Sequence, residues 1–112
     1  MTGLVRTTED KAIAYKAISG AGAIQIKDCK GMEFNIKEVY QTEGVRKDTG
    51  EAAILTAIID DGGKVYQSMS PTLAESVEKL YEIFGDDISG LGVKVATGVS
   101  KAGREFFQLE LL

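Results

Sequence analysis

The order of the predicted secondary-structure elements constrains this chain more than any single motif does. Three segments with the apolar pattern of strands come first, one amphipathic helix follows, and two further strands complete the 112 residues. The predicted strands cover residues 32–42, 52–60, 64–69, 93–99 and 104–111, and the helix covers 71–84. This order is that of the OB-fold, a five-stranded Greek-key barrel with one helix between strands three and four. We therefore expect an all-β fold in a single domain over residues 1–112.

The predicted helix carries clear signals at both ends and along one face. Ser70 is a favourable N-cap, Pro71 fits the first helical position, and Gly85 suits the position after the last turn. The apolar residues at helical spacing are Leu73, Val77, Leu80, Tyr81 and Phe84. We expect this helix to close one end of the barrel with that face buried.

The first predicted strand contains a break in its alternation. Apolar residues alternate as far as Ile36, and Val39 then falls out of phase. A β-bulge near Lys37 and Glu38 would return Val39 to the core and would bend the strand, as a small barrel requires.

A short N-terminal helix is also predicted, over residues 8–19. Thr8 can cap it, and Gly20 and Gly22 follow it. Its apolar stripe consists of Ala12, Ile13, Tyr15, Ala17 and Ile18.

The composition argues against catalysis and against metal binding. Histidine is absent, which removes the commonest general base and the commonest metal ligand. The lone Cys29 cannot build a cysteine-rich zinc site or an internal disulfide, and it favours a reducing, intracellular compartment. Asp60 and Asp61 are adjacent carboxylates, but they lie in a Gly-Gly turn where Asp is common anyway. We expect no enzymatic activity, no cofactor and no metal; the sequence assigns no role to Cys29.

The charge is unevenly distributed along the chain. The net charge is −4, and residues 72–87, with five acidic residues and one lysine, carry all of it. Residues 11–37 sum to +3. Such a dipolar protein can bind a polyanion on one side while its acidic side faces away. No apolar run approaches the ~20 residues of a membrane span, so no membrane partner is expected.

The last predicted hairpin offers the best candidate for nucleic-acid contact. Phe106 faces outward if its neighbours in the alternation face the core, and Arg104 and Lys101 lie close to it in the sequence. An exposed ring beside cations can stack a base and hold its phosphate. Lys94 on the preceding strand is a further candidate for phosphate contact. The alternative is that Phe106 packs under the N-terminal helix or in a dimer interface.

Two other segments are candidates for the same reason. Tyr66 beside Lys64 could stack a base, or it could lie on the core side with its hydroxyl at the barrel rim. Tyr40 has the same ambiguity. Arg46 and Lys47 lie at a loop tip, where basic residues suit phosphate contact, although a solvated tip with ordinary charges is equally consistent.

Three segments together resemble a known family. They are Ile26–Phe34 (IKDCKGMEF), Asp61–Tyr66 (DGGKVY) and the run from Val93 to Val95 continued by Ser100–Phe107 (SKAGREFF). They resemble small single-stranded-DNA-binding proteins of bacteriophages that infect Gram-positive bacteria, over residues 8–111. The resemblance implies an OB-fold protein that coats single-stranded DNA during replication or recombination in the host cytoplasm, often as a homodimer.

This chain departs from that family pattern in two respects. Many such proteins end in an acidic tail that recruits partners, whereas this sequence ends in LELL. Its aromatic content is only 7%, without tryptophan. The expected function is non-enzymatic, sequence-tolerant binding of single-stranded DNA. The alternative is a protein-interaction or structural module whose exposed aromatic residues form a subunit interface.

Overall fold

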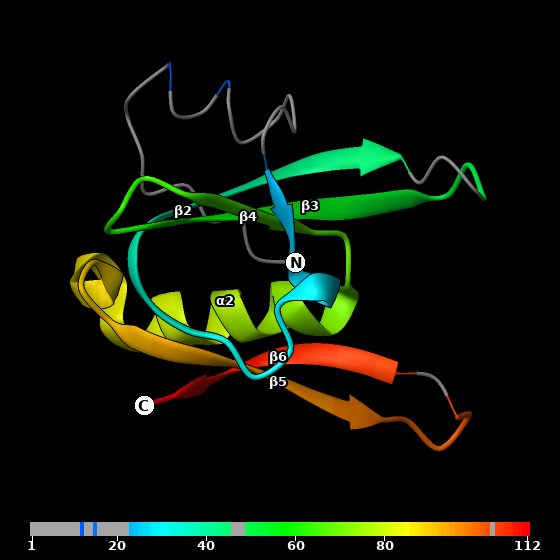
Figure 1. The fold of residues 1–112 in the computed structure, drawn as a ribbon. Coiled ribbons are helices and arrows are strands. Elements are labelled where there is room, and N and C mark those ends of the chain that lie inside the picture. Colours follow the sequence, from blue (N-terminus) through cyan, green and yellow to red (C-terminus); the bar gives the residue numbers. More distant parts are fainter. Residues whose placement is uncertain (1–11, 13–14, 16–22, 46–48, 104) are drawn as a thin grey trace.

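The computed structural model describes residues 12, 15, 23–45, 49–103 and 105–112. Within them, six strands form one curled sheet in the order β1-β4-β3-β2-β5-β6 (Figure 1). The elements are β1 (Ile24–Gln25), η1 (Ile26–Asp28), β2 (Glu33–Val45), β3 (Ala52–Asp60), β4 (Val65–Ser68), α2 (Pro71–Phe84), η2 (Gly85–Ile88), β5 (Gly92–Val99) and β6 (Glu105–Leu111). The structure confirms a mostly β architecture, shaped as a half-barrel, with one α-helix between β4 and β5.

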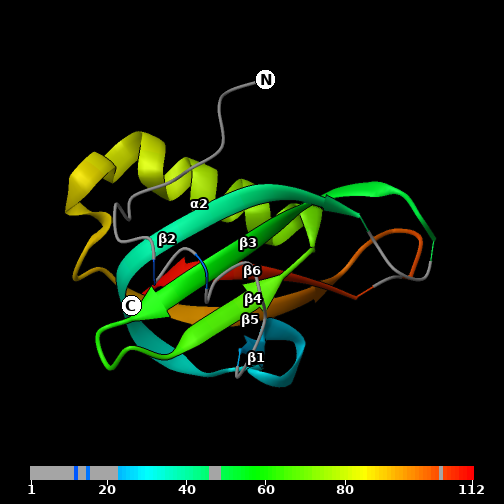
Figure 2. The same cartoon turned by 90° about the horizontal axis from the view of Figure 1, so that it is seen from above.

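Strand β2 curls the sheet, because it pairs with different neighbours along its 13 residues. Its first three residues pair antiparallel with β5, so that Phe34 lies opposite Val93. From Ile36 onward it pairs with β3. The register shifts between Ile36 and Glu38, which confirms the predicted bulge. The bend carries β2 from the layer of β5 and β6 into the layer of β3 and β4 (Figures 1 and 2).

The described chain has six strands, one more than the five predicted. The additional strand is β1, whose Ile24 and Gln25 pair in parallel with Tyr66 and Gln67 of β4. This pairing covers part of the outer edge of β4, where backbone groups would otherwise remain unpaired. A strand of two residues is too short to show a periodic pattern in the sequence.

Most of the predicted N-terminal helix over residues 8–19 lies outside the described residues. Ala12 and Tyr15 are described, and both are helical. Both are also exposed, Tyr15 to 73%. The apolar stripe predicted for this helix is therefore solvent-facing at these two positions; alanine presents little apolar area, and the tyrosine ring tolerates water at its polar end.

Helix α2 has the bounds predicted for it. The Ser70 side chain accepts a hydrogen bond from the Leu73 backbone N–H at 3.4 Å, and Gly85 follows the helix with a φ of 56°. Leu73 and Val77 are fully buried, and the helix lies between the two layers of the sheet (Figure 1). Phe84 is only partly buried. No helix in the described part of the chain is long and apolar enough to cross a membrane.

A buried polar contact fixes α2 to the sheet layer that contains β3 and β4. The Gln41 side chain is fully buried, and its Nε2 donates to Thr56 Oγ1 at 3.2 Å and to the Ala74 carbonyl at 3.3 Å. These bonds join β2, β3 and the first turns of α2. A buried amide stays in place because losing its partners would leave it unsatisfied, at a cost of about 1–3 kcal/mol.

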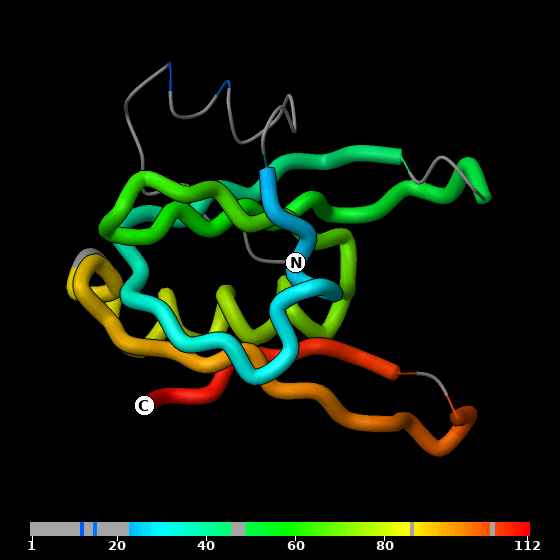
Figure 3. Tube along the Cα trace, in the orientation of Figure 1, coloured from blue at the N-terminus to red at the C-terminus, as the bar shows by residue number. Residues whose placement is uncertain are grey.

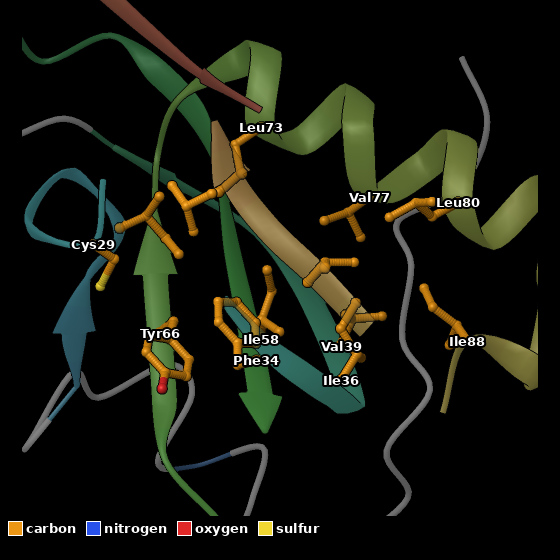
Figure 4. Close-up of a cluster of buried hydrophobic side chains, with 13 residues drawn as sticks. Cys29, Phe34, Ile36, Val39, Ile58, Tyr66, Leu73, Val77, Leu80 and Ile88 are labelled. Carbon is orange, nitrogen blue, oxygen red and sulfur yellow. The ribbon is translucent and has the colours of Figure 1, made fainter. Parts of the chain in front are cut away.

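The main core lies between the two layers and the helix. Its buried residues are Ile26, Cys29, Phe34, Ile36, Val39, Ile58, Tyr66, Leu73, Val77, Leu80, Ile88, Val93 and Val95. Figure 4 shows Leu73, Val77 and Leu80 of α2 pointing toward the strands. A smaller cluster on the other face of the sheet consists of Ala57, Ile59 and Val65, with Ala23 and Tyr40 packed against it.

Two hairpins extend beyond the core on the same side of the molecule (Figures 1 and 3). We call the outer part of β2–β3 (Glu43–Val45 with Ala52–Ile54) the upper arm, and the outer part of β5–β6 (Thr97–Val99 with Glu105–Phe107) the lower arm. Val45 of the upper arm is 60% exposed, and Val99 of the lower arm is 71% exposed. An ion pair at 2.8 Å between Lys30 Nζ and Glu105 Oε2 anchors the lower arm to the turn before β2.

Candidate nucleic-acid interface

The register of the β5–β6 hairpin decides which of its side chains face outward. Phe107 and Leu109 pack against the main core. The opposite face carries the cross-strand pairs Lys94–Glu110, Ala96–Gln108 and Gly98–Phe106. Because successive side chains of a strand point to opposite faces, Phe106 points away from the core, in the phase predicted from the sequence.

The ring of Phe106 lies over the backbone of Gly98. A Cβ atom placed on Gly98 would be 2.9 Å from Phe106 Cε1 and 3.0 Å from Cε2, and closer still to Cζ. Phe106 is partly exposed and belongs to neither apolar cluster. Gly98 is not among the residues predicted from the sequence, although a glycine inside a strand can signal such a close approach.

The eight aromatic residues, four Tyr and four Phe, all belong to the described part of the chain. The rings that belong to an apolar cluster or pack against one are those of Phe34, Tyr40, Tyr66, Tyr81, Phe84 and Phe107. The two outside both clusters are Phe106 and Tyr15. Phe106 is therefore the one ring on the strands that packs against neither apolar cluster, and it is partly exposed.

Tyr66 occupies the second of the two positions considered for it, on the core side. It is 1% exposed, and its ring stacks on Phe34 with centroids 4.5 Å apart and an interplanar angle of 8°. Figure 4 shows its hydroxyl at the edge of the core. Burial raises the pKa of Tyr66, and the hydrogen bond to Asp60 raises it further. A ring this deeply buried cannot stack on a base, so the structure removes Tyr66 from the candidate site.

Asp60 organises the turn between β3 and β4. Its Oδ1 accepts hydrogen bonds from the backbone N–H groups of Gly62 at 2.9 Å and Lys64 at 2.8 Å. Its Oδ2 accepts from the Tyr66 hydroxyl at 2.8 Å. These contacts account for the carboxylate as a turn-forming group, in line with the structural interpretation of the adjacent Asp60 and Asp61.

Tyr40 is also committed to packing in part. It lies on the face of β2 that carries the smaller cluster, and its ring packs against that cluster while remaining partly exposed. Its neighbours there include Ala57 and Ile59 of β3. Tyr40 thus keeps only a limited surface for contact with a ligand.

Among the predicted basic residues, the three that the structure describes do not form one continuous patch. Lys64, Lys94 and Lys101 are all exposed. Lys64 follows the β3–β4 turn, which lies at the end of the molecule opposite the arms (Figure 1). Lys94 lies between Glu33 and Glu110 in the register, and two carboxylates on neighbouring strands weaken its attraction for a phosphate. Lys101 lies in the β5–β6 turn, at the end of the lower arm.

Three further predicted residues, Arg46, Lys47 and Arg104, lie outside the described residues. Their neighbours in the sequence are described: Val45 ends β2, and Gly103 and Glu105 flank position 104. The upper and lower arms extend from the same side of the barrel (Figure 3). The fold thus brings to one side of the molecule the two hairpins whose loops carry these basic residues.

The described residues offer little for metal or thiol chemistry. They contain no group of three or more His, Cys, Asp or Glu side chains arranged to hold a metal ion. The Cys29 thiol is 3% exposed and donates a hydrogen bond to the Gln25 carbonyl at 3.4 Å. Burial raises the pKa of Cys29, and the charge of Asp28 raises it further, which keeps the thiol protonated and unreactive.

A comparison with protein families identifies the group to which the chain is related. One family model matches residues 4–112 of the chain. It is the model of the Phi29 phage single-stranded DNA-binding protein family. The chain belongs to this family. The match confirms the resemblance to phage single-stranded DNA-binding proteins drawn from the sequence. No curated protein and no solved structure matches the chain.

Membership of the phage single-stranded DNA-binding family directs attention to the exposed aromatic and basic side chains of the β5–β6 hairpin. Single-strand binding combines aromatic rings that stack on bases with cations that follow the backbone. In this family member, the outward ring of Phe106 and the exposed Lys101 lie on the same hairpin.

Proposed function

We propose that this protein binds single-stranded DNA without sequence preference and without catalysing a reaction. The observation that carries the proposal is the outward, partly exposed ring of Phe106 in a member of a phage single-stranded DNA-binding family. Stacking tolerates any sequence because every base has a π-face. The sequence lacks histidine, which is consistent with a binding role rather than with acid–base catalysis.

In this proposal, the DNA backbone contacts the loops at the ends of the arms. Lys101 and Arg104 belong to the lower loop, and Arg46 and Lys47 belong to the upper loop. Helix α2, which carries the exposed carboxylates of Glu75 and Glu82, lies on a flank of the molecule, beyond β2 in Figure 2. A polyanion approaching the arms would avoid that flank.

We further propose that the half-barrel is an OB-fold. The order β4-β3-β2-β5-β6, with α2 between β4 and β5, supports this assignment. The two loops that border the binding face of an OB-fold would then be those at the ends of the upper and lower arms. The OB-fold assignment and the basic residues of the two loops therefore both support DNA binding on the side of the molecule from which the arms extend.

The proposed biological role is coating of single-stranded DNA during replication or recombination of a phage in the cytoplasm of a Gram-positive host. The protein would act as a homodimer. These proposals are supported by the family and by the sequence resemblance, and the exposed Val45 and Val99 of the arms offer apolar area for contact between subunits.

The same two valines favour the alternative, a protein-interaction module in which the arms and Phe106 form a subunit interface. Fluorescence anisotropy with labelled oligo-dT at two salt concentrations separates the two functions. Single-strand binding predicts saturable binding that weakens steeply with salt. Sedimentation of the free protein then reports its oligomeric state. A protein that associates with itself but does not bind oligo-dT would support the alternative.

A further inference from the structure

We infer that Gly98 positions the Phe106 ring as a stacking platform for one nucleobase. Gly98 would act through the ring rather than by touching the DNA itself. This inference rests on the proposed single-stranded DNA binding and assigns a role to a residue that carries no side chain.

The ring of Phe106 lies in close contact with strand β5 at Gly98. The nearest atoms to a Cβ on Gly98 are Cζ, Cε1 and Cε2 of Phe106, with the latter two at 2.9 and 3.0 Å. Real Cβ atoms are not found so close to other atoms, so any side chain at position 98 must displace the ring. These atoms form the far end of a flexible side chain, and the ring can tilt away from the strand without a change in the backbone.

The backbone does not require glycine at position 98. The glycines with positive φ in the described residues are Gly31, Gly50, Gly63, Gly85, Gly90 and Gly103, and Gly98 is not among them. A strand position with ordinary φ accepts alanine, and glycine inside a strand is less favourable than a residue with a side chain. The close approach of Phe106 is therefore what distinguishes Gly98 from alanine here.

The residues around the Phe106 ring leave part of it exposed. On the outward face, Gly98 and Ala96 are small residues of β5, and they lie opposite Phe106 and Gln108 of β6. The distal atoms of the ring lie against Gly98, and the side chain is partly exposed, so part of the ring remains accessible to a base. Lys101, three residues after Gly98 in the sequence, supplies an exposed cation in the turn of the same hairpin.

A double-mutant cycle tests the inference. Oligo-dT affinity is measured by anisotropy for the wild type, Gly98→Ala, Phe106→Ala and the double variant. Stacking of one base predicts an affinity loss of about 5- to 150-fold for Phe106→Ala. Gly98→Ala is expected to lose at least about fivefold of affinity, the lower end of that range, with its thermal unfolding unchanged. In the Phe106→Ala background, Gly98→Ala should cause no further loss, because the two residues act through one ring.

Gly62→Ala is the matched control, since Gly62 has ordinary φ, its Cβ would meet its nearest atom at 3.4 Å, and it lies in the β3–β4 turn away from the arms. Wild-type affinity in Gly98→Ala would overturn the inference, as would a further affinity loss in the double variant. An unfolded Gly98→Ala protein would also overturn it, because the ring would then be a fixed part of the fold. If the wild type itself does not bind oligo-dT, the proposed function fails, which is a separate outcome.

Discussion

At the scale of single residues, Tyr66 and Phe106 show how burial separates two rings that the sequence presents alike. Each lies on a strand close to a basic residue. Tyr66 is held by Phe34 and by Asp60 in the core, whereas Phe106 lies on the surface over Gly98. The position of each ring therefore predicts a different effect of mutation: loss of stability for Tyr66 and loss of DNA affinity for Phe106.

Tyr66→Phe should destabilise the fold and leave the oligo-dT affinity of the folded protein unchanged. The change leaves Asp60, which is 7% exposed, without the hydroxyl that donates to its Oδ2. An unsatisfied buried acceptor costs about 1–3 kcal/mol, and denaturant unfolding measures this loss. A Tyr66→Phe protein with normal stability and weakened DNA binding would return Tyr66 to the binding site.

The same tyrosine predicts a pH dependence. Burial and the Asp60 hydrogen bond raise the pKa of Tyr66 in the folded state, whereas a tyrosine in the unfolded chain ionises near pH 10. The stability linked to its protonated form is therefore fully present below about pH 10 and is lost as the pH rises further. Unfolding free energies at pH 8 and pH 11 should differ less in Tyr66→Phe than in the wild type. An equal difference would show that Tyr66 does not contribute.

At the scale of elements, α2 holds the two layers of the half-barrel together. Leu73 near its start is fully buried, while Glu75 two residues later faces solvent. The helix also receives the Gln41 hydrogen bond at the Ala74 carbonyl. Its contribution to stability should therefore come from one face and not from the other.

Leu73→Ala should lower the free energy of unfolding by about 2–5 kcal/mol, as expected for a leucine truncated inside a packed core. Glu75→Ala is the matched control on the exposed face and should change it by less than about 0.5 kcal/mol. Chemical denaturation of both variants checks the difference. Similar small effects of the two changes would mean that α2 does not close the core as described.

The sequence predicted α2 and β3 with their observed bounds, because caps, turn residues and periodicity are local signals. It did not predict the face of Tyr66, because β4 has only four residues and Val65, Tyr66 and Gln67 are all buried, so no alternation distinguishes its two faces. The setting of Lys94 between Glu33 and Glu110 was equally hidden, since it depends on the pairing of strands distant in the sequence.

At the scale of the whole molecule, the arms and the acidic helix give the protein two different surfaces. The turn at the end of the lower arm carries Lys101, and the exposed face of α2 carries Glu75 and Glu82. This separation allows a chain with a net charge of −4 to bind a polyanion locally. It also predicts that individual lysines contribute unequally to the salt dependence.

Replacing Lys101 and Arg104 with alanine should make the log-log salt slope of oligo-dT binding shallower by about 1.4, because each cation bound to a phosphate accounts for about 0.7 of the slope. Lys94→Ala should change the slope less than Lys101→Ala does, because Glu33 and Glu110 flank Lys94. Lys79→Ala on the exposed face of α2 is the control and should leave it unchanged. Equal slopes for all these variants and the wild type would place the DNA elsewhere.

The most direct test of the central claim is the affinity of Phe106→Ala for oligo-dT, measured beside its thermal unfolding. We predict that the variant unfolds at nearly the wild-type temperature and loses about 1–3 kcal/mol of binding free energy, because one exposed stacking ring has been removed. An affinity equal to that of the wild type would contradict the claim that the lower arm holds the DNA. A large fall in the unfolding temperature would contradict the claim that Phe106 is a surface residue free to bind.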